Sequence, residues 1–104
     1  MLDMLKGLFS SGPKVDIASI VHDGAFLVDV RTTGEFSDDH VKGSVNIPLD
    51  KVGSQLAKFK DKKHIIVFCR SGARSSQAKA ILENNGFTNV VNGGSWLNMK
   101  QYVK

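Results

Sequence analysis

The hydrophobic positions of this chain form short continuous runs that alternate with segments of helical spacing. Continuous apolar or β-branched runs, which are typical of strands buried in a parallel sheet, lie at residues 25–30, 44–48, 64–68 and 87–91. Apolar residues recur at helical spacing within residues 16–22, 49–59, 75–85 and 95–102. This order of strands and helices predicts an α/β domain whose central sheet is mainly parallel.

Glycines and one acidic residue mark the ends of these helices. We expect Asp16 to cap the N-terminus of the first helix, because its short carboxylate can accept backbone N–H groups there. Gly24 and Gly86 are expected to end the first and third helices, since glycine readily adopts the left-handed conformation of a helix C-terminus. Gly53 lies inside the second predicted helix and is expected to weaken it.

The length of 104 residues fits one domain rather than two. An apolar stripe over residues 1–9 ends at Ser10–Pro13, so we predict an N-terminal helical extension at 1–13 and a single domain at 14–104. Hydrophobic residues make up 41% and charged residues 23%, which is typical of a folded chain. Because the chain shows neither a signal peptide nor an apolar run of roughly 18–20 residues, we expect a cytoplasmic protein that does not enter membranes. A periplasmic protein given without its leader is the alternative that stays open.

The net charge of +4 is unevenly distributed along the chain. Residues 1–61 carry 7 positive and 9 negative side chains, whereas residues 62–104 carry 7 positive and 1 negative. The basic residues are scattered, without an Arg-rich run or interleaved aromatic residues, so we expect no nucleic-acid partner. The basic half contains the only cysteine, Cys69, which indicates a local preference for small anions.

A single cysteine excludes an internal disulfide, a Cys-x-x-Cys pair and a multi-thiolate metal site, and we expect neither a metal nor a cofactor. Cys69 follows the clearest buried strand and opens a loop that leads to the helix predicted from Ser75. Ligands of open α/β sheets bind beyond the carboxyl ends of the strands. The backbone amides expected to point inward and bind one anion there belong to Arg70, Ser71, Gly72, Ala73 and Arg74.

The surroundings of Cys69 favour its thiolate form. A helix N-terminus and the side chains of Arg70 and Arg74 all stabilise a negative charge, so Cys69 is predicted to be a nucleophile. Ser71 and Ser75 can donate hydrogen bonds to the sulfur or cap the helix. The alternative is a buried structural cysteine, but a polar loop with two arginines is a poor segment for a core.

The loop Cys69-Arg-Ser-Gly-Ala-Arg74 resembles the active-site loop of rhodanese-like sulfurtransferases, in the Cys-x-x-Gly-x-Arg form of single-domain members. Further segments are similar to the family's motifs and follow them in order. They are Leu27-Val-Asp-Val-Arg31 with Glu35-Phe36, then His40-Val-Lys-Gly-Ser-Val-Asn-Ile-Pro48, and then Gly86-Phe87 followed by Gly93-Gly94. The chain departs from the family at Asp39, where glycine is usual, and at Asn98, where tryptophan is common and Trp96 comes early.

The resemblance implies a rhodanese-like domain, with helices on both faces of the sheet, and thiosulfate sulfurtransferase activity. Cys69 would take a sulfane sulfur from thiosulfate or a similar small anion, hold it as a persulfide and pass it to cyanide or a thiol. The loop amides would stabilise the persulfide, Arg74 would close the loop and Arg70 would hold the donor. Because the chain has no second cysteine, an external acceptor, either a small molecule or a protein, must complete the cycle.

The resemblance also implies structural rather than catalytic roles for four residues outside the loop. Arg31 is expected to bond Glu35 and to fix the following segment, with Asp29 beside them at the end of a strand. His40 is expected to support the scaffold, because persulfide exchange requires no general base and the spacing offers no Cys-His pair.

Two other functions stay open on the sequence. A cysteine phosphatase or arsenate reductase would use the same fold, but related phosphatases place an arginine six positions after the cysteine, where this chain has Ser75. The other is a sulfur carrier or regulatory module that acts on a protein partner. The intact Cys69, Gly72 and Arg74 argue against a module that has lost its chemistry.

Overall fold

The computed structural model describes residues 15–103 and contains one sheet of four parallel strands. The strands are β1 (Phe26–Asp29), β2 (Val45–Asn46), β3 (Ile65–Cys69) and β4 (Val90–Ser95). Their order across the sheet is β2-β1-β3-β4, so β1 and β3 lie in the middle. Each neighbouring pair is parallel, which confirms the predicted α/β class.

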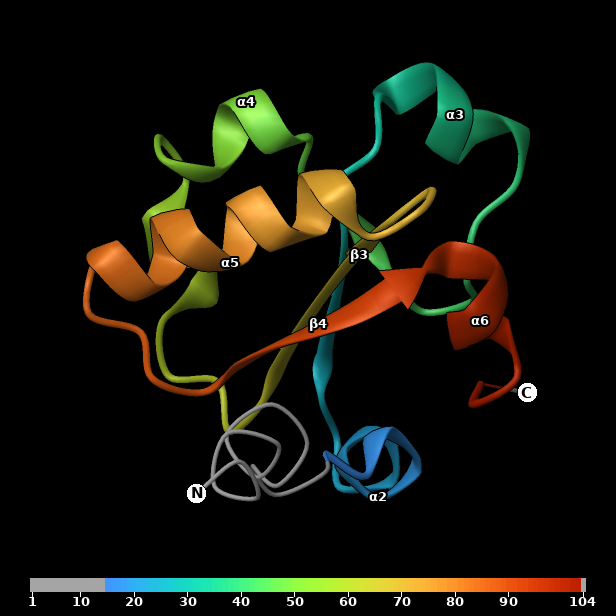
Figure 1. The fold of residues 1–104 in the computed structure, drawn as a ribbon, viewed down its shortest axis with the longest axis horizontal. Helices are drawn as coiled ribbons and strands as arrows, with labels where there is room; N and C mark the ends of the chain where they lie inside the picture. The colour runs from blue at the N-terminus through green and yellow to red at the C-terminus, as the bar shows by residue number, and fades with distance from the viewer. Residues whose placement is uncertain (1–14, 104) are drawn as a thin grey trace, which may run out of the picture.

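Helices cover both faces of this sheet, as the resemblance implied. They are α2 (Ile17–His22), α3 (Thr33–Asp38), α4 (Leu49–Val52), the 3₁₀ helix η1 (Leu56–Phe59), α5 (Ala73–Asn84) and α6 (Trp96–Lys100). One hydrophobic cluster contains buried side chains of α4, η1 and α5, and a second contains those of α6 with α2 packed against it. Figure 1 shows α4 and α5 on the left of β1 and β3, and α6 on the right.

Every side chain of β3 is buried, because this central strand has a hydrophobic cluster on each face. Ile65, Val67 and Cys69 belong to the cluster with α5, whereas Ile66 and Phe68 belong to the cluster with α6. This alternation is the period of two of an extended strand. It places Cys69, the last residue of β3, on the face that α5 covers.

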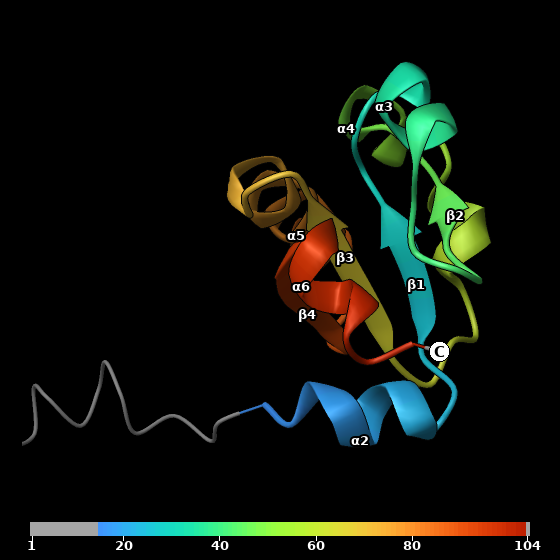
Figure 2. The same cartoon turned by 90° about the vertical axis from the view of Figure 1, so that its right-hand side faces the viewer.

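The loops that follow the strands meet at one edge of the sheet. Figure 2 shows α3 and α4 near the ends of the strand arrows, and α2 at the opposite, N-terminal ends of the strands. The carboxyl edge of a parallel sheet is where ligands bind in α/β proteins. The fold therefore brings the loop after Cys69 to the expected location of a binding site.

The predicted helix over residues 49–59 is two short helices, α4 and η1. Gly53 has helical dihedral angles, with φ −64° and ψ −25°, so it continues the turn of α4. The chain leaves the helical region at Gln55, with φ −125° and ψ 34°. The interruption therefore comes from the backbone at Gln55 and not from unusual dihedral angles at the glycine.

Helix α3 was not predicted from the hydrophobic pattern, because none of its residues is fully buried. A capping box starts it: the Thr32 hydroxyl accepts from the Glu35 N–H, and the Glu35 carboxylate accepts from the Thr32 N–H. The Thr-x-x-Glu pattern is the sequence signal for this helix. Strand β4 also differs from prediction, since it begins at Val90 and extends to Ser95.

The predicted helix caps at both ends of α2 are confirmed. The Asp16 carboxylate accepts from the Ser19 N–H at 3.2 Å, and Gly24 follows the helix with a φ of +92°. The predicted helical extension at residues 1–13 lies outside the described residues. Within residues 15–103, no helix is both long enough and apolar enough to cross a membrane.

Candidate active site

Cys69 ends β3, and only three residues connect it to α5. Helix α5 begins at Ala73, two residues earlier than predicted, so the loop consists of Arg70, Ser71 and Gly72. Gly72 has a φ of +100°, a left-handed conformation that glycine adopts without strain. The chain therefore turns tightly beside the cysteine side chain.

Hydrogen-bond donors of this turn converge on the sulfur of Cys69. The Gly72 N–H lies 3.0 Å from Sγ and the Ser75 N–H lies 3.4 Å from it, and both donate to the sulfur. The Ser75 hydroxyl oxygen lies 3.5 Å from Sγ. This cluster of donors at the N-terminus of α5 stabilises a negative charge on the sulfur.

The pKa of the Cys69 thiol lies below its ordinary value because of these donors. Burial has the largest single effect and raises the pKa, since Cys69 is 1% exposed. The Ser75 side chain and the N–H groups of Ser75, Ser71 and Gly72 together outweigh it. A structural cysteine surrounded by apolar groups would instead have a raised pKa.

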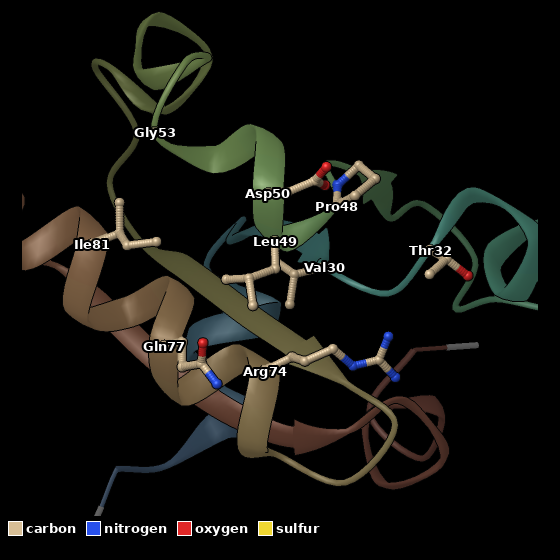
Figure 3. Close-up of a pocket in the computed structure, with 9 residues that line it drawn as sticks. All are labelled: Val30, Thr32, Pro48, Leu49, Asp50, Gly53, Arg74, Gln77 and Ile81. Atoms are coloured by element: carbon tan, nitrogen blue, oxygen red, sulfur yellow. The ribbon is translucent and has the colours of Figure 1, made fainter.

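Arg74, in the first turn of α5, pairs with Glu35 of α3. Its Nη1 and Nη2 donate to the two carboxylate oxygens at 2.7 and 3.1 Å, a bidentate geometry. Hydrogen bonding from Arg74 is the main reason that the pKa of Glu35 falls to about 2. Figure 3 shows Arg74 extending toward Thr32 along a pocket of about 540 Å³ that α4 and α5 border.

The predicted pair between Arg31 and Glu35 is wrong. Arg31 instead donates through Nε and Nη2 to the Asp29 carboxylate at 2.7–3.0 Å, and through Nη2 to the carbonyl of Asp39 at 2.7 Å. Asp29 and Arg31 are both buried. Asp29 and Arg31 are two residues apart along extended chain, so their side chains lie on the same side of it. The Glu35 carboxylate is already bound by Arg74.

Arg70 is the exposed cation next to Cys69. It lines a second pocket, of about 380 Å³, together with residues of α3 and with Trp96 at the start of α6. Among residues 15–103, no carboxylate forms an ion pair with Arg70. Ser71 is also exposed in the loop, and Ala73 is the first residue of α5. The positive charge of Arg70 is therefore available to an anion in solution.

The two departures from the family lie directly after α3 and within α6. Asp39 forms an ion pair with Lys100 of α6 at 3.3 Å. Trp96 lies under two cations, with its ring centroid 4.4 Å from the Arg31 guanidinium and 5.1 Å from the Lys100 ammonium. His40 stacks on Phe36 of α3, so the predicted support role of His40 would act at the end of that helix.

Asn92 of β4 is a residue of the site that the sequence reasoning missed. Its side chain accepts a hydrogen bond from the Ser75 hydroxyl at 2.7 Å and donates one to the Gly72 carbonyl at 3.2 Å. Its position directly before Gly93-Gly94 is the available signal, because asparagine side chains commonly bond the backbone two residues further on. Here the Gly94 N–H donates to Asn92 at 2.9 Å.

The arrangement combines a cysteine of lowered pKa with backbone N–H donors, which is the combination that a thiolate nucleophile and a small-anion site both need. The described part of the chain contains no cluster of three His, Cys, Asp or Glu side chains that could hold a metal ion. The chemistry that the geometry directly supports is attack by the Cys69 sulfur, with backbone N–H groups offsetting its charge.

The fold and site define an α/β protein with a buried cysteine at the carboxyl edge of a parallel sheet, where backbone N–H groups donate to its sulfur. The family model of the rhodanese-like domain matches residues 14–97. The chain therefore belongs to the rhodanese-like family, which confirms the resemblance identified in the sequence.

Three comparisons describe its relation to known members. The thiosulfate sulfurtransferase PspE of Escherichia coli K12 is 39% identical over 69 residues, which cover 64% of this chain and 66% of PspE, just under two thirds. The thiosulfate sulfurtransferase GlpE of Pseudomonas savastanoi is 33% identical over 88 residues, which cover 83% of each chain. A solved structure described as rhodanese with anions from E. coli has a TM-score of 0.66 at 35% identity, over 72% of this chain and 91% of that chain.

Proposed function

We propose that this chain is a sulfurtransferase that moves a sulfane sulfur from thiosulfate, or a similar small anion, to cyanide or a thiol through a persulfide on Cys69. The observation that carries the proposal is the pair of N–H groups, of Gly72 and Ser75, that donate to the buried Cys69 sulfur. The names of PspE and GlpE support the same class of reaction. We propose the cytoplasm as its location, because a reducing compartment keeps the thiol free.

In the first half-reaction the Cys69 thiolate attacks the outer sulfur of thiosulfate. A bond forms between Sγ and that sulfur, while the bond between the outer sulfur and the sulfite group breaks, and sulfite leaves with the electron pair. The product is Cys69-S-S⁻, which keeps one negative charge near the N–H groups of the loop. Arg70 is the cation proposed to attract the donor, because it is exposed and unpaired within residues 15–103.

In the second half-reaction a nucleophile attacks the outer sulfur of the persulfide. Cyanide forms a carbon–sulfur bond and leaves as thiocyanate, while the electron pair of the broken S–S bond returns to Sγ as thiolate. A thiol acceptor, small or on a protein, reacts in the same way as its thiolate and becomes a persulfide. Sulfite leaves before the acceptor reacts, and the protein alternates between its thiolate and persulfide forms, so the kinetics should be ping-pong.

The geometry gives less support to a cysteine phosphatase on this fold. Transfer of a tetrahedral phosphoryl group needs cationic and N–H donors around several oxygens. Arg74 is bound to Glu35 through both terminal nitrogens, and the sixth position after the cysteine is Ser75. A three-residue loop over a cysteine that is 1% exposed better suits one sulfur atom.

The test is the intact mass of the purified protein after incubation with thiosulfate. We expect a gain of one sulfur atom in the wild type, no gain in Cys69→Ser, and loss of the added sulfur with release of thiocyanate when cyanide is supplied. Ser54→Ala changes an exposed residue outside the site and should behave like the wild type. Absence of a sulfur adduct with thiosulfate and with mercaptopyruvate would contradict the proposal, and phosphatase substrates would be tested next.

A further inference from the structure

Asn92 connects β4 to both residues that donate to Cys69. Its Nδ2 donates to the Gly72 carbonyl at 3.2 Å, and its Oδ1 accepts from the Ser75 hydroxyl at 2.7 Å. Gly72 and Ser75 are the residues whose N–H groups lie 3.0 and 3.4 Å from Sγ. A single side chain from a neighbouring strand thus contacts both donor residues of the loop.

The orientation of the Asn92 amide is determined by its neighbours. The Gly94 N–H lies 2.9 Å from one atom of the amide, and a backbone N–H can only donate. That atom is therefore Oδ1, which leaves Nδ2 facing the Gly72 carbonyl, an obligate acceptor. The side chain has one orientation that satisfies its partners, so it is held rigidly.

A bulge in β4 gives Asn92 this position. Asn92 and Gly94 pair with consecutive residues of β3, so Gly93 between them has no partner of its own. The catalytic loop rests on the strand at this point, since a Cβ added to Gly72 would lie 3.6 Å from Gly94 Cα. The bulge and the loop therefore pack together, and the Asn92 amide joins them.

We propose that Asn92 is a positioning residue for Cys69, which holds Gly72 and Ser75 where their N–H groups reach Sγ. Its contacts with the site run through these two residues, so it acts on the sulfur indirectly. This inference rests on the proposed function in one respect. An effect of Asn92 on the rate of persulfide formation requires that Cys69 takes up sulfur. The charged groups around the loop, which the test leaves unchanged, are Arg70, Arg74 of α5, Glu35 of α3, Asp29 at the end of β1 and Arg31 after it.

The direct test is the rate at which iodoacetamide alkylates Cys69 between about pH 5 and pH 10, which reports the thiolate fraction. In Asn92→Ala the donors lose their support, so the midpoint should move to higher pH and the rate near pH 7 should fall about three- to tenfold. Asn89→Ala is the matched control, because Asn89 bonds the carbonyls of Lys62 and Lys63 before β4 begins. Its alkylation profile should equal that of the wild type.

Thermal unfolding is measured alongside, because Asn92→Ala removes hydrogen bonds at a partly buried position. If that variant does not fold, Asn92→Ser replaces it. The serine hydroxyl is too short to bridge Gly72 and Ser75. The alkylation midpoint should therefore again move to higher pH, by a smaller amount than in Asn92→Ala. A wild-type alkylation profile in either folded variant would overturn the positioning role, whatever the change in melting temperature.

The alkylation experiment does not depend on sulfur transfer. If the wild type takes no sulfur from thiosulfate, the proposed function fails while the effect of Asn92 on the thiolate is still measured. If the wild type is sulfurated and Asn92→Ala has an unshifted alkylation profile, the positioning role fails and the proposed function stands.

Discussion

At the residue scale, Arg70 in the loop after Cys69 and Arg74 at the start of α5 have different electrostatic surroundings. Arg74 is bound by both oxygens of Glu35, so its charge is largely neutralised. Arg70 is exposed, and no carboxylate of residues 15–103 is paired with it. Arg74 therefore links α5 to α3, and we propose that the charge of Arg70 acts on an anionic donor.

Arg70→Gln should slow persulfide formation from thiosulfate about two- to fivefold at low salt, because one exposed charge contributes roughly 0.5–1 kcal/mol. The loss should appear as a higher KM and should shrink as salt is added. Lys58→Gln removes the same charge from an exposed position of η1 and should have little effect on the rate. Sulfite release at several thiosulfate concentrations measures both variants. Equal KM values for Arg70→Gln and the wild type would exclude a role in donor binding.

The pair between Arg74 and Glu35 makes a pH-dependent contribution to stability. The pKa of Glu35 falls from 4.5 to about 2 in the folded protein, so its contribution is fully present above about pH 4.5 and is lost as the pH falls toward 2. Glu35→Gln removes the charge but can keep the capping box, and should cost about 1 kcal/mol or less at neutral pH. Melting temperatures measured from neutral to acid pH should converge for the two proteins.

Glu83→Gln is the control for this measurement. Glu83 lies 4.0 Å from Lys79 on the surface of α5, and its replacement should change the melting temperature less at every pH. A difference between Glu35→Gln and the wild type that stays constant down to about pH 2 would show that the charge of Glu35 is not its cause.

At the element scale, the pattern of apolar residues predicts the helices and strands whose side chains are buried. Strand β3 was predicted within one residue because all its side chains are buried, and α5 was predicted because Ala78 and Leu82 face the core. Helix α3 has no buried residue, so its apolar pattern is weak and only its capping box identifies it. The end of β4 lacks strand-forming residues, and pairing with β3 holds it extended.

The sequence likewise predicted those features of the site that depend on neighbouring residues in the chain. The position of Cys69 and its loop followed from local features: a buried strand, a glycine and a helix start. The partners of Arg31, Arg74 and Asn92 did not, because they depend on contacts between elements. Arg74 and Glu35 are 39 positions apart, and only the tertiary fold, which brings the start of α5 within side-chain reach of α3, determines that they meet.

Gly53→Ala should stabilise the protein by about 0.4–1 kcal/mol, because alanine restricts the unfolded chain more than glycine does. The position is compatible with alanine, since Gly53 has helical dihedral angles and an added Cβ would contact only Ile81, at 4.0 Å. Gly24→Ala is the opposite case. An added Cβ would have open space there, but the φ of +92° strains alanine, so the substitution should destabilise the protein by about 1–2 kcal/mol. Thermal unfolding compares the two. A lower melting temperature for Gly53→Ala would contradict the assignment of α4 through Gly53.

At the scale of the whole molecule, one buried ion pair joins segments from both halves of the chain. Arg31 binds the Asp29 carboxylate at the end of β1 and the carbonyl of Asp39 after α3. Its guanidinium also lies 4.4 Å from the ring centroid of Trp96, at the start of α6. The carboxyl edge of the sheet, where the site lies, is therefore held by a charge pair whose side chains are 4% and 0% exposed.

Asp29→Asn should cost about 3–5 kcal/mol, because it leaves the buried Arg31 guanidinium without a counter-charge. That is a large share of the roughly 5–15 kcal/mol that stabilises a typical domain. Asp23→Asn breaks exposed pairs with Lys63 and His64 and should cost much less. Urea unfolding of both variants gives the comparison. Similar losses would mean that burial does not decide the strength of the pair, and a larger loss for Asp29→Asn would identify it as the support of this edge.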